Sequence, residues 1–312
     1  MLSVSIIETT LKKWDRAAIV RSRPRRILNE QDYQSRQYFP TERLPLCMHP
    51  RVAALGDEAL RYIQVQTLYH YLNGIANIEL EIINDSTYKL YKNTAGVDFP
   101  ANIRLEALTV VVDESYHALV ALDLINQVEQ MTGIAPLSMP KDTEASFALA
   151  LALGQTPDEH RELFRLVCVS LSEQALTTDL IDVIDNEDIF PSFYQIMKDH
   201  VADEGRHARF SQQILGHIWR HSDTHAKEAM KRPILTFIEH YTTDAIAKEF
   251  SVRMLDHLNM DAETIAAVIH DTYPPADTKP WETNNIVTQQ MLLALDKAGI
   301  LEDLPISKIA QA

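Results

Sequence analysis

Glycine and cysteine are both scarce in this chain, and each scarcity excludes a class of protein. Only 8 of the 312 residues are glycine, which is too few for an architecture built on many tight turns. Neither GxGxxG nor GxxxxGK[ST] occurs, so no dinucleotide or P-loop phosphate site is indicated. The two cysteines, Cys47 and Cys168, do not make a disulfide framework. Cys168 lies in FRLVCVSL and is predicted to be a small buried hydrophobe.

The chain also lacks a long apolar run and an excess of positive charge. No apolar stretch approaches the roughly 20 residues that span a membrane, and the start MLSVSIIETTLKKWD does not have the pattern of a signal peptide. We therefore expect a cytoplasmic protein with no membrane partner. The net charge of −15 argues against nucleic-acid binding. The basic patch RSRPRR at 21–26 is interpreted as an exposed arm or as a surface that neutralises an acidic partner subunit.

Helical periodicity dominates the chain after residue 50. The first 50 residues hold four prolines, and they are interpreted as an extended N-terminal arm with at most one short helix. Residues 51–312 are expected to form a single domain. The apolar period of 3.6 residues predicts helices over 57–84, 102–132, 157–184, 190–219, 226–257 and 282–298. Strand-like alternation never persists, so the sequence predicts an all-α fold: a four-helix bundle with additional C-terminal helices.

Several helix ends have a chemical signature. The segment TPDE at 156–159 resembles an N-cap, a proline in the first turn and a capping-box glutamate. Pro191 fits the first turn of the next helix. Gly133 and Gly154 stand where helices should stop. Residues 272–281, TYPPADTKPW, are predicted to form a loop.

The motif Asp-Glu-x-x-His occurs twice, at residues 113–117 and 203–207. A glutamate and a histidine three residues apart project from one helical face, where together they can bind one metal ion. A single Glu-x-x-His means little, because chance alone predicts about one in a chain of this composition. Two copies that share the preceding aspartate, both within predicted helices, point to Glu114, His117, Glu204 and His207 as metal ligands.

The surroundings of the first motif support a buried site. The helical face of Glu114 is apolar, and a buried glutamate and histidine need compensation that a metal ion can supply. Asp113 and Asp203 would each accept the second ring N–H of a ligating histidine, either within their own helix or across the bundle. The apolar residues of this face are Ala107, Val110, Val111, Ala118, Ala121 and Ile125.

A bundle with Glu-x-x-His on two helices needs one further glutamate from each of the other two to complete a dinuclear site. Glu79 lies on the apolar stripe of the helix predicted over 57–84, whereas Glu81 lies on its polar side. Glu173 is central on the stripe of the helix over 157–184. His200 precedes Glu204 by four residues and shares its face, so it is either a seventh ligand or a core histidine.

These residues resemble the ligand set of the p-aminobenzoate N-oxygenase (AurF) family, which are ferritin-like diiron enzymes. The likeness rests on Glu79, Glu114 with His117, Glu173 and the His-x3-Glu-x2-His cluster of His200, Glu204 and His207, and it covers about residues 60–260. The third histidine is its most specific element. A carboxylate-rich site with imidazole also suits iron or manganese better than metals that prefer thiolates.

The resemblance implies two iron ions, dioxygen as co-substrate and oxygenation of an amine nitrogen to a hydroxylamine, nitroso or nitro product in specialised metabolism. It further implies an external electron donor, a homodimer, and an amine substrate that is free or tethered to a carrier protein. Tyr71, two turns before Glu79, is expected either to line the substrate pocket or to belong to the core. A basic residue should hold a substrate carboxylate; the candidates are Arg253 and Lys279, because Arg206 should point away from the metals.

Two alternatives remain open at the level of the sequence. One is another ferritin-like diiron oxidase or hydroxylase, which would not need the third histidine His200. The other is a non-enzymatic iron-binding bundle, which would not need additional C-terminal helices to close a pocket.

Overall fold

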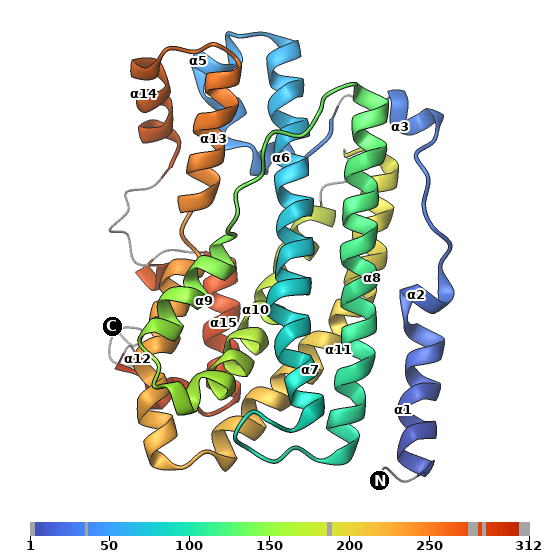
Figure 1. Cartoon of the computed structure of the whole chain (residues 1–312). Helices are drawn as coiled ribbons and strands as arrows, with labels where there is room; N and C mark the ends of the chain where they lie inside the picture. The colour runs from blue at the N-terminus through green and yellow to red at the C-terminus, as the bar shows by residue number, and fades with distance from the viewer. Residues whose placement is uncertain (1–3, 35–36, 186–188, 274–279, 283–284, 306–312) are drawn as a thin grey trace.

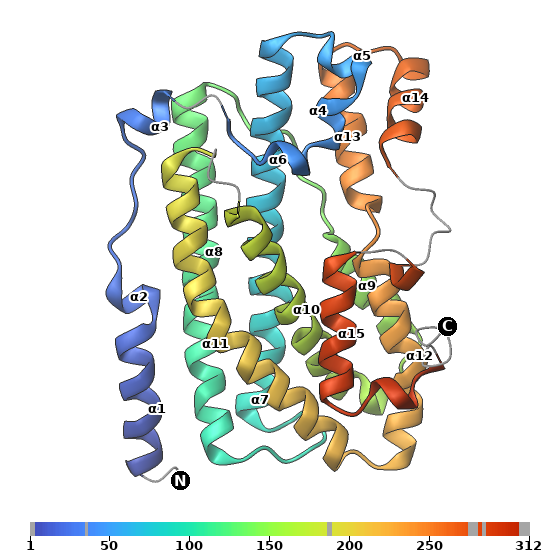
Figure 2. The ribbon, with the colours of Figure 1, turned by 180° about the vertical axis from the view of Figure 1, so that it is seen from behind.

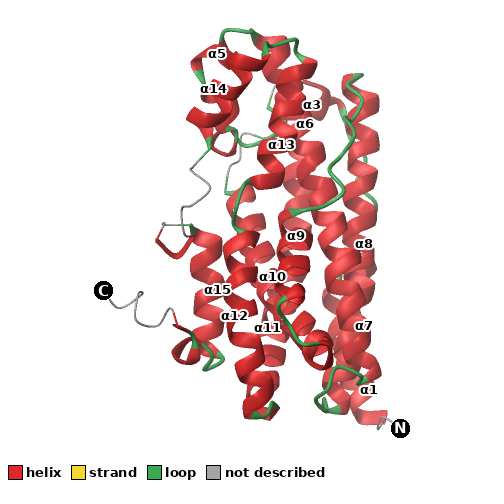
Figure 3. Ribbon diagram, turned by 60° about the vertical axis from the view of Figure 1, so that its left-hand side comes forward, coloured by secondary structure: helices red, strands yellow, loops and turns green. Residues whose placement is uncertain are grey.

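The computed structural model describes residues 4–34, 37–185, 189–273, 280–282 and 285–305. Throughout these residues the secondary structure is helical and includes no strand, as Figure 3 shows. The predicted all-α, ferritin-like class is therefore confirmed. Within the same residues, no helix is both long and apolar enough to cross a lipid bilayer.

A central bundle is built from four long helical segments that are joined in antiparallel pairs (Figures 1 and 2). The first segment continues through a π-helical stretch, η2, and on to Lys92, so it is longer than the predicted 57–84. The segments are α6 (Asp57–Asn77) with η2 (Ile78–Asn84) and α7 (Asp85–Lys92), then α8 (Ala101–Thr132), α10 (Arg161–Ile184) and α11 (Pro191–His221).

The remaining helices of the second half cover one side and one end of this bundle. A helical pair, α9 (Glu144–Gly154) and α12 (Thr224–Tyr241), packs beside α10, and α15 (Ile286–Lys297) packs on α10 and α11 (Figure 2). At one end, α13 (Ala245–His257) and α14 (Ala262–Thr272) enclose a second, smaller core. The wall of the cavity described below comes from α6 and α10, from the starts of α9 and α15 and from the junction between α12 and α13.

The N-terminal arm is partly helical rather than simply extended. It contains α1 (Val4–Ala17), α2 (Ile19–Ser22), α3 (Glu30–Gln34), η1 (Thr41–Arg43), α4 (Pro45–Met48) and α5 (Pro50–Ala53). As Figure 1 shows, α1 and α2 lie along α8. The basic patch ties this arm to the bundle: Arg25 pairs with Asp123 at 2.6 Å and Arg26 with Asp199 at 2.5 Å. These arginines of the patch therefore form ion pairs with acidic residues of the same chain.

The structure corrects several predicted helix boundaries. The predicted helix 226–257 is divided between α12 and α13, since the hydroxyls of Thr242 and Thr243 bond to the carbonyls of Ile238 and His240. Such side-chain bonds compete with the continuation of a helix. The helices α9 and α14 were not predicted.

The predicted N-cap at Thr156 is wrong, because its hydroxyl donates to the carbonyl of Ala152, and a short 3-10 turn precedes α10. In contrast, Pro191 lies in the first turn of α11, and Gly133 ends α8 with a left-handed φ of 70°, both as predicted. Cys168 is fully buried, also as predicted. Most of the predicted loop 272–281 lies outside the described residues.

Candidate metal centre

The centre of the bundle brings together all seven residues predicted as metal ligands. Each of them is at most 5% exposed. Their donor atoms form two groups, and within each group the atoms lie within 4.8 Å of one another. Glu114 and Glu204 belong to both groups. The first group also contains Glu79, His117 and His200, and the second also contains Glu173 and His207.

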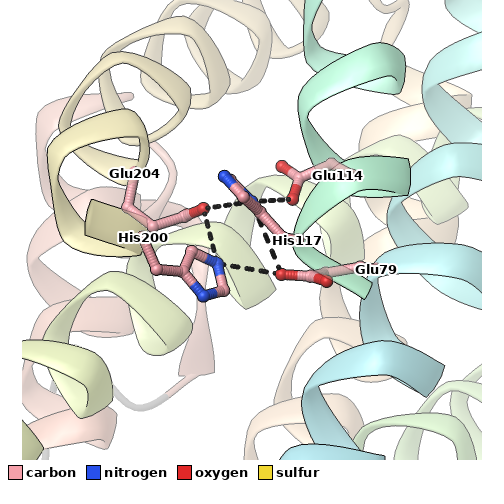
Figure 4. A group of neighbouring side chains, drawn as sticks. All are labelled: Glu79, Glu114, His117, His200 and Glu204. Carbon is pink, nitrogen blue, oxygen red and sulfur yellow. Dashed lines mark hydrogen bonds and ion pairs between the residues drawn. The ribbon is translucent and has the colours of Figure 1, made fainter. Parts of the chain in front are cut away.

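This sharing is the geometry of a dinuclear site. Glu114 on α8 and Glu204 on α11 face each other across the bundle, so each carboxylate can bridge two metal positions. Figure 4 shows the first group, in which side chains from η2, α8 and α11 converge. One metal position would therefore have two histidines and the other position only one.

Glu79 reaches the site from an irregular stretch of helix. It is the second residue of η2, the π-helical segment Ile78–Asn84. A π-helical turn accommodates an additional residue, and such turns are frequent at functional sites. Sequence periodicity located Glu79 on the buried face but gave no sign of the π-helical turn.

His200 lies on the ligand face of α11 rather than at its edge. Its Nε2 is 2.9 Å from Glu79 Oε1 and 3.2 Å from Glu204 Oε1. Its ring centroid is 4.0 Å from that of His117. A histidine placed only by core packing would not need to direct a ring nitrogen at two buried carboxylates, so this geometry favours ligation.

The two motif aspartates contact histidines across the bundle. His117 Nε2 lies 3.1 Å from Asp203 Oδ2, and His207 Nε2 lies 3.3 Å from Asp113 Oδ2. If each Nε2–H donates to its aspartate, each Nδ1 is left unprotonated and faces the glutamates, as a metal ligand requires. The sequence left open whether these pairs form within a helix or between helices; they form between α8 and α11.

Three further groups hold these aspartates in place. The guanidinium of Arg206 contacts Asp113 at 3.1 Å and Asp203 at 2.5 Å, so it points away from the metal site as predicted. From the arm, Trp14 Nε1 donates to Asp113 at 2.8 Å, and the backbone N–H of Ile19 donates to Asp203 at 3.1 Å. Sequence reasoning missed Trp14 and Ile19, because nothing local marks them and they lie far from both motifs along the chain.

Burial and neighbouring charges shift the pKa values of the site's glutamates and histidines. Burial raises the pKa of Glu79 to about 7. Burial, together with the charges of Glu114 and Glu204, raises the pKa of Glu173 well above its usual range. Burial disfavours the charged imidazole of His207, yet the charges of Glu114 and Glu204 outweigh this and raise its pKa. Two divalent ions would neutralise the four carboxylates.

Buried polar atoms without a hydrogen-bond partner gather at the same place. Such atoms are costly unless something else satisfies them. Among the described residues, both carboxylate oxygens of Glu79, Glu114 Oε1, Glu173 Oε2, Glu204 Oε2 and His200 Nε2 make no hydrogen bond, although Glu79 Oε1 lies 2.9 Å from His200 Nε2 and Glu114 Oε1 lies 2.7 Å from His207 Nδ1. A metal ion satisfies such atoms, and a set of oxygen and imidazole donors suits iron or manganese. The residues present therefore fit a dinuclear iron centre.

A cavity of about 330 Å³ opens beside the candidate metal centre. Its wall includes Ile75, one turn before Glu79, and Leu176, three residues after Glu173. Tyr71 also lines it, and its ring packs on Phe39 of the core at a centroid distance of 5.3 Å, so the residue belongs to the cavity wall and to the edge of the core. The cavity therefore adjoins the helical turns that carry Glu79 and Glu173, although none of the seven candidate ligands is among its described lining residues.

The expected carboxylate anchor is not found among the described candidates. Arg206 is held by the motif aspartates, and Arg253 pairs with Glu249 and donates to the carbonyl of Ser138, outside the cavity wall. Lys279 lies outside the described residues. Arg43, which was not predicted, is the arginine among the described residues that line the cavity.

Comparison with protein-family models matches residues 7–279 to the family described as P-aminobenzoate N-oxygenase AurF. The chain belongs to this family. The match is wider than the residues 60–260 on which the resemblance rested, and it includes Trp14 and Ile19. AurF is a family of diiron enzymes, which agrees with the buried clusters of glutamate and histidine. A search of curated proteins finds no match.

Proposed function

We propose that this AurF-family protein is a non-haem diiron oxygenase that uses dioxygen to oxygenate the nitrogen of an amine. The observation that carries the proposal is the pair of donor groups that share Glu114 and Glu204. Membership of an N-oxygenase family supports the choice of amine nitrogen over carbon. The third histidine, His200, favours an N-oxygenase over other ferritin-like oxidases and over an iron-storage protein.

The first oxygenation step balances with an external reductant. An amine, dioxygen, two electrons and two protons give a hydroxylamine and water. Repetition would give nitroso and nitro products. When bound, the two iron ions would activate dioxygen and supply the oxygen atom to the substrate.

The residues of this chain have separate tasks in this reaction. Glu79, Glu114, Glu173 and Glu204 hold the ions and balance their charge. The crossed aspartate–histidine pairs orient His117 and His207. The apolar wall at Ile75 and Leu176 excludes water from the inner end of the cavity and favours the neutral, nucleophilic form of the amine. The substrate is a free amine or one tethered to a carrier protein.

Mass spectrometry of a panel of amines, free and carrier-bound, tests the proposal. Iron-loaded, chemically reduced protein is mixed with isotopically labelled dioxygen. The expected product contains one labelled oxygen on nitrogen. A matched Glu173→Ala variant should lose the activity, whereas Glu159→Gln, an exposed change, should retain it. Catalytic iron mineralisation without amine consumption would support storage instead, and a label on carbon would support a hydroxylase.

A further inference from the structure

The cavity beside the metal centre has an unbalanced charge. Four carboxylates and one arginine are among its described lining residues, and burial lowers the pKa of its histidine, His70, to about 4, so that this ring is neutral near pH 7. A cavity made to hold an anion would have the opposite excess. The lining residues with a guanidinium, imidazole or carboxyl group are Arg43, His70, Asp142, Glu144, Asp179 and Asp244.

Arg43 is already engaged by its own chain. Its guanidinium pairs with Asp179 and, at 3.0 Å, with Asp182, and it also donates to the carbonyl of Asp179. Burial opposes its charge, but Asp179 and Asp182 more than offset this and raise its pKa. A substrate carboxylate would have to displace these carboxylates from Arg43.

The carboxylates of Asp142 and Glu144 lie on the other side of the cavity. Among the described residues, neither Asp142 nor Glu144 takes part in an ion pair. Glu144 Oε1 accepts the backbone N–H of Ala247 at 3.0 Å, in the first turn of α13. Burial raises the pKa of Glu144, and the charge of Asp244 adds to the rise. Burial also raises the pKa of Asp244, although the charge of Lys248 acts to lower it. A cation bound here would relieve the repulsion.

The two ends of the cavity therefore differ in chemistry. The part of the wall that adjoins Glu79 and Glu173 is formed by Ile75, Ile78 and Leu176, which are apolar. The acidic part lies at the start of α9 and at the junction between α12 and α13. An amine that reacts must be neutral, and the apolar end favours this form, whereas the acidic end favours a positive charge.

We infer that the cavity takes an amine with a second, cationic group, which Glu144 and Asp142 bind while the reacting nitrogen faces the metals. This inference rests on the proposed function, since it names the class of substrate for the same site. It also accounts for the engagement of Arg43, the arginine among the described lining residues, by Asp179 and Asp182, since the preferred substrate carries no carboxylate.

Three arylamines of similar size test the inference: 4-aminobenzylamine with a cationic substituent, 4-methylaniline with a neutral one and 4-aminobenzoate with an anionic one. Binding to the iron-loaded protein is measured by calorimetry without oxygen. One charge-assisted hydrogen bond predicts about tenfold tighter binding of 4-aminobenzylamine than of 4-methylaniline. 4-Aminobenzoate should bind most weakly. Equal or tighter binding of 4-aminobenzoate would overturn the inference.

Two variants test whether Glu144 and Asp142 bind the cationic group of the substrate. Glu144→Gln keeps an acceptor for the N–H of Ala247 while removing the charge, and Asp142→Asn changes an exposed residue that should not affect folding. Each should reduce the preference for 4-aminobenzylamine several-fold and leave the affinity for 4-methylaniline nearly unchanged. Glu159→Gln, which removes an exposed acid outside the cavity, is the control. An unchanged preference in both cavity variants would contradict the assignment.

Adding oxygen separates this inference from the proposed function. If 4-aminobenzylamine binds preferentially but is never oxygenated on nitrogen, the charge selectivity stands and the N-oxygenase proposal fails. If all three arylamines are oxygenated and bind alike, the N-oxygenase proposal stands and the cationic substrate class is wrong.

Discussion

The indole of Trp14 donates a hydrogen bond to Asp113, 99 positions further along the chain, at 2.8 Å from Oδ1 and 3.0 Å from Oδ2. Asp113 in turn contacts His207, whose other ring nitrogen faces Glu114 and Glu204. A half-buried side chain of the N-terminal arm is therefore only two contacts away from the candidate metal site.

Trp14→Phe should weaken metal binding while keeping the aromatic ring. Without the indole N–H, Asp113 is less firmly oriented, and so is His207. Loss of such an outer contact typically reduces metal affinity about tenfold or more. Competition between the protein and a ferrous chelator measures the change. Trp219→Phe removes a comparable indole–carboxylate bond, to Asp303, and should leave the affinity for iron unchanged; equal losses in both variants would mean a general loss of stability.

Arg206→Ala should destabilise the metal-free protein. Asp113 and Asp203 are fully buried, and the substitution removes the cation between them. Breaking a buried ion pair typically costs about 3–5 kcal/mol, and the partial exposure of Arg206 reduces the expected loss to about 2–3 kcal/mol. Urea unfolding without metal measures it. The exposed Arg209→Ala on the same helix is the control, and a loss no larger than the control's would refute the role of Arg206.

His200→Ala should weaken binding at one of the two metal positions and leave the other position intact. His200 belongs to the group with Glu79 and not to the group with Glu173. We expect iron retained after gel filtration to fall from two ions toward one per chain, and amine oxidation to fall with it. His221→Ala, an exposed change on α11, should retain both ions. Full retention of iron and activity in His200→Ala would show that this residue is a core histidine and not a ligand.

His70 should make stability depend on pH in the acidic range. Burial lowers its pKa to about 4 in the folded protein, below the ordinary value of about 6.5. Between these values the unfolded chain binds the proton and the folded chain does not, so stability falls as pH falls from 6.5 to 4 and is unaffected above 6.5. The expected contribution is about 2 kcal/mol.

The His70→Gln variant tests this pH dependence. The difference in unfolding free energy between pH 7 and pH 4.5 should be smaller in the variant than in the original chain. The exposed His270→Gln should not change it. An identical pH dependence in all three proteins would rule out His70 as the cause.

The sequence was most informative where chemistry and periodicity coincide. Glu79 and Glu173 were located because each is a charged residue on an otherwise apolar stripe, and the paired motifs supplied Glu114, Glu204 and their histidines. The structure brings all of these side chains together. Such signals are local, so one helix is enough to show them.

Contacts between distant segments could not be predicted in this way. The bonds of Trp14 and Ile19 to the motif aspartates depend on where the arm docks, and no local pattern encodes that. The helix α9 was missed because its sequence EASFALALALG is apolar almost all round, so it has no polar face to reveal a period. Its partner α12 was predicted, but not its end at Tyr241, which depends on two threonine hydroxyls.

The π-helical stretch Ile78–Asn84 limits how this chain can change its length. It accommodates one residue more than a regular helix would, and the α-helical segments on both sides of it pack against α8. Deleting a single residue here would restore regular helical bonding and leave α6 and α7 in phase. A deletion elsewhere in α6 or α7, where no π-helical turn absorbs it, would rotate one segment against the other by roughly 100° and turn its apolar stripe toward water. This helix should therefore tolerate the loss of one residue within η2 better than the loss of one residue outside it.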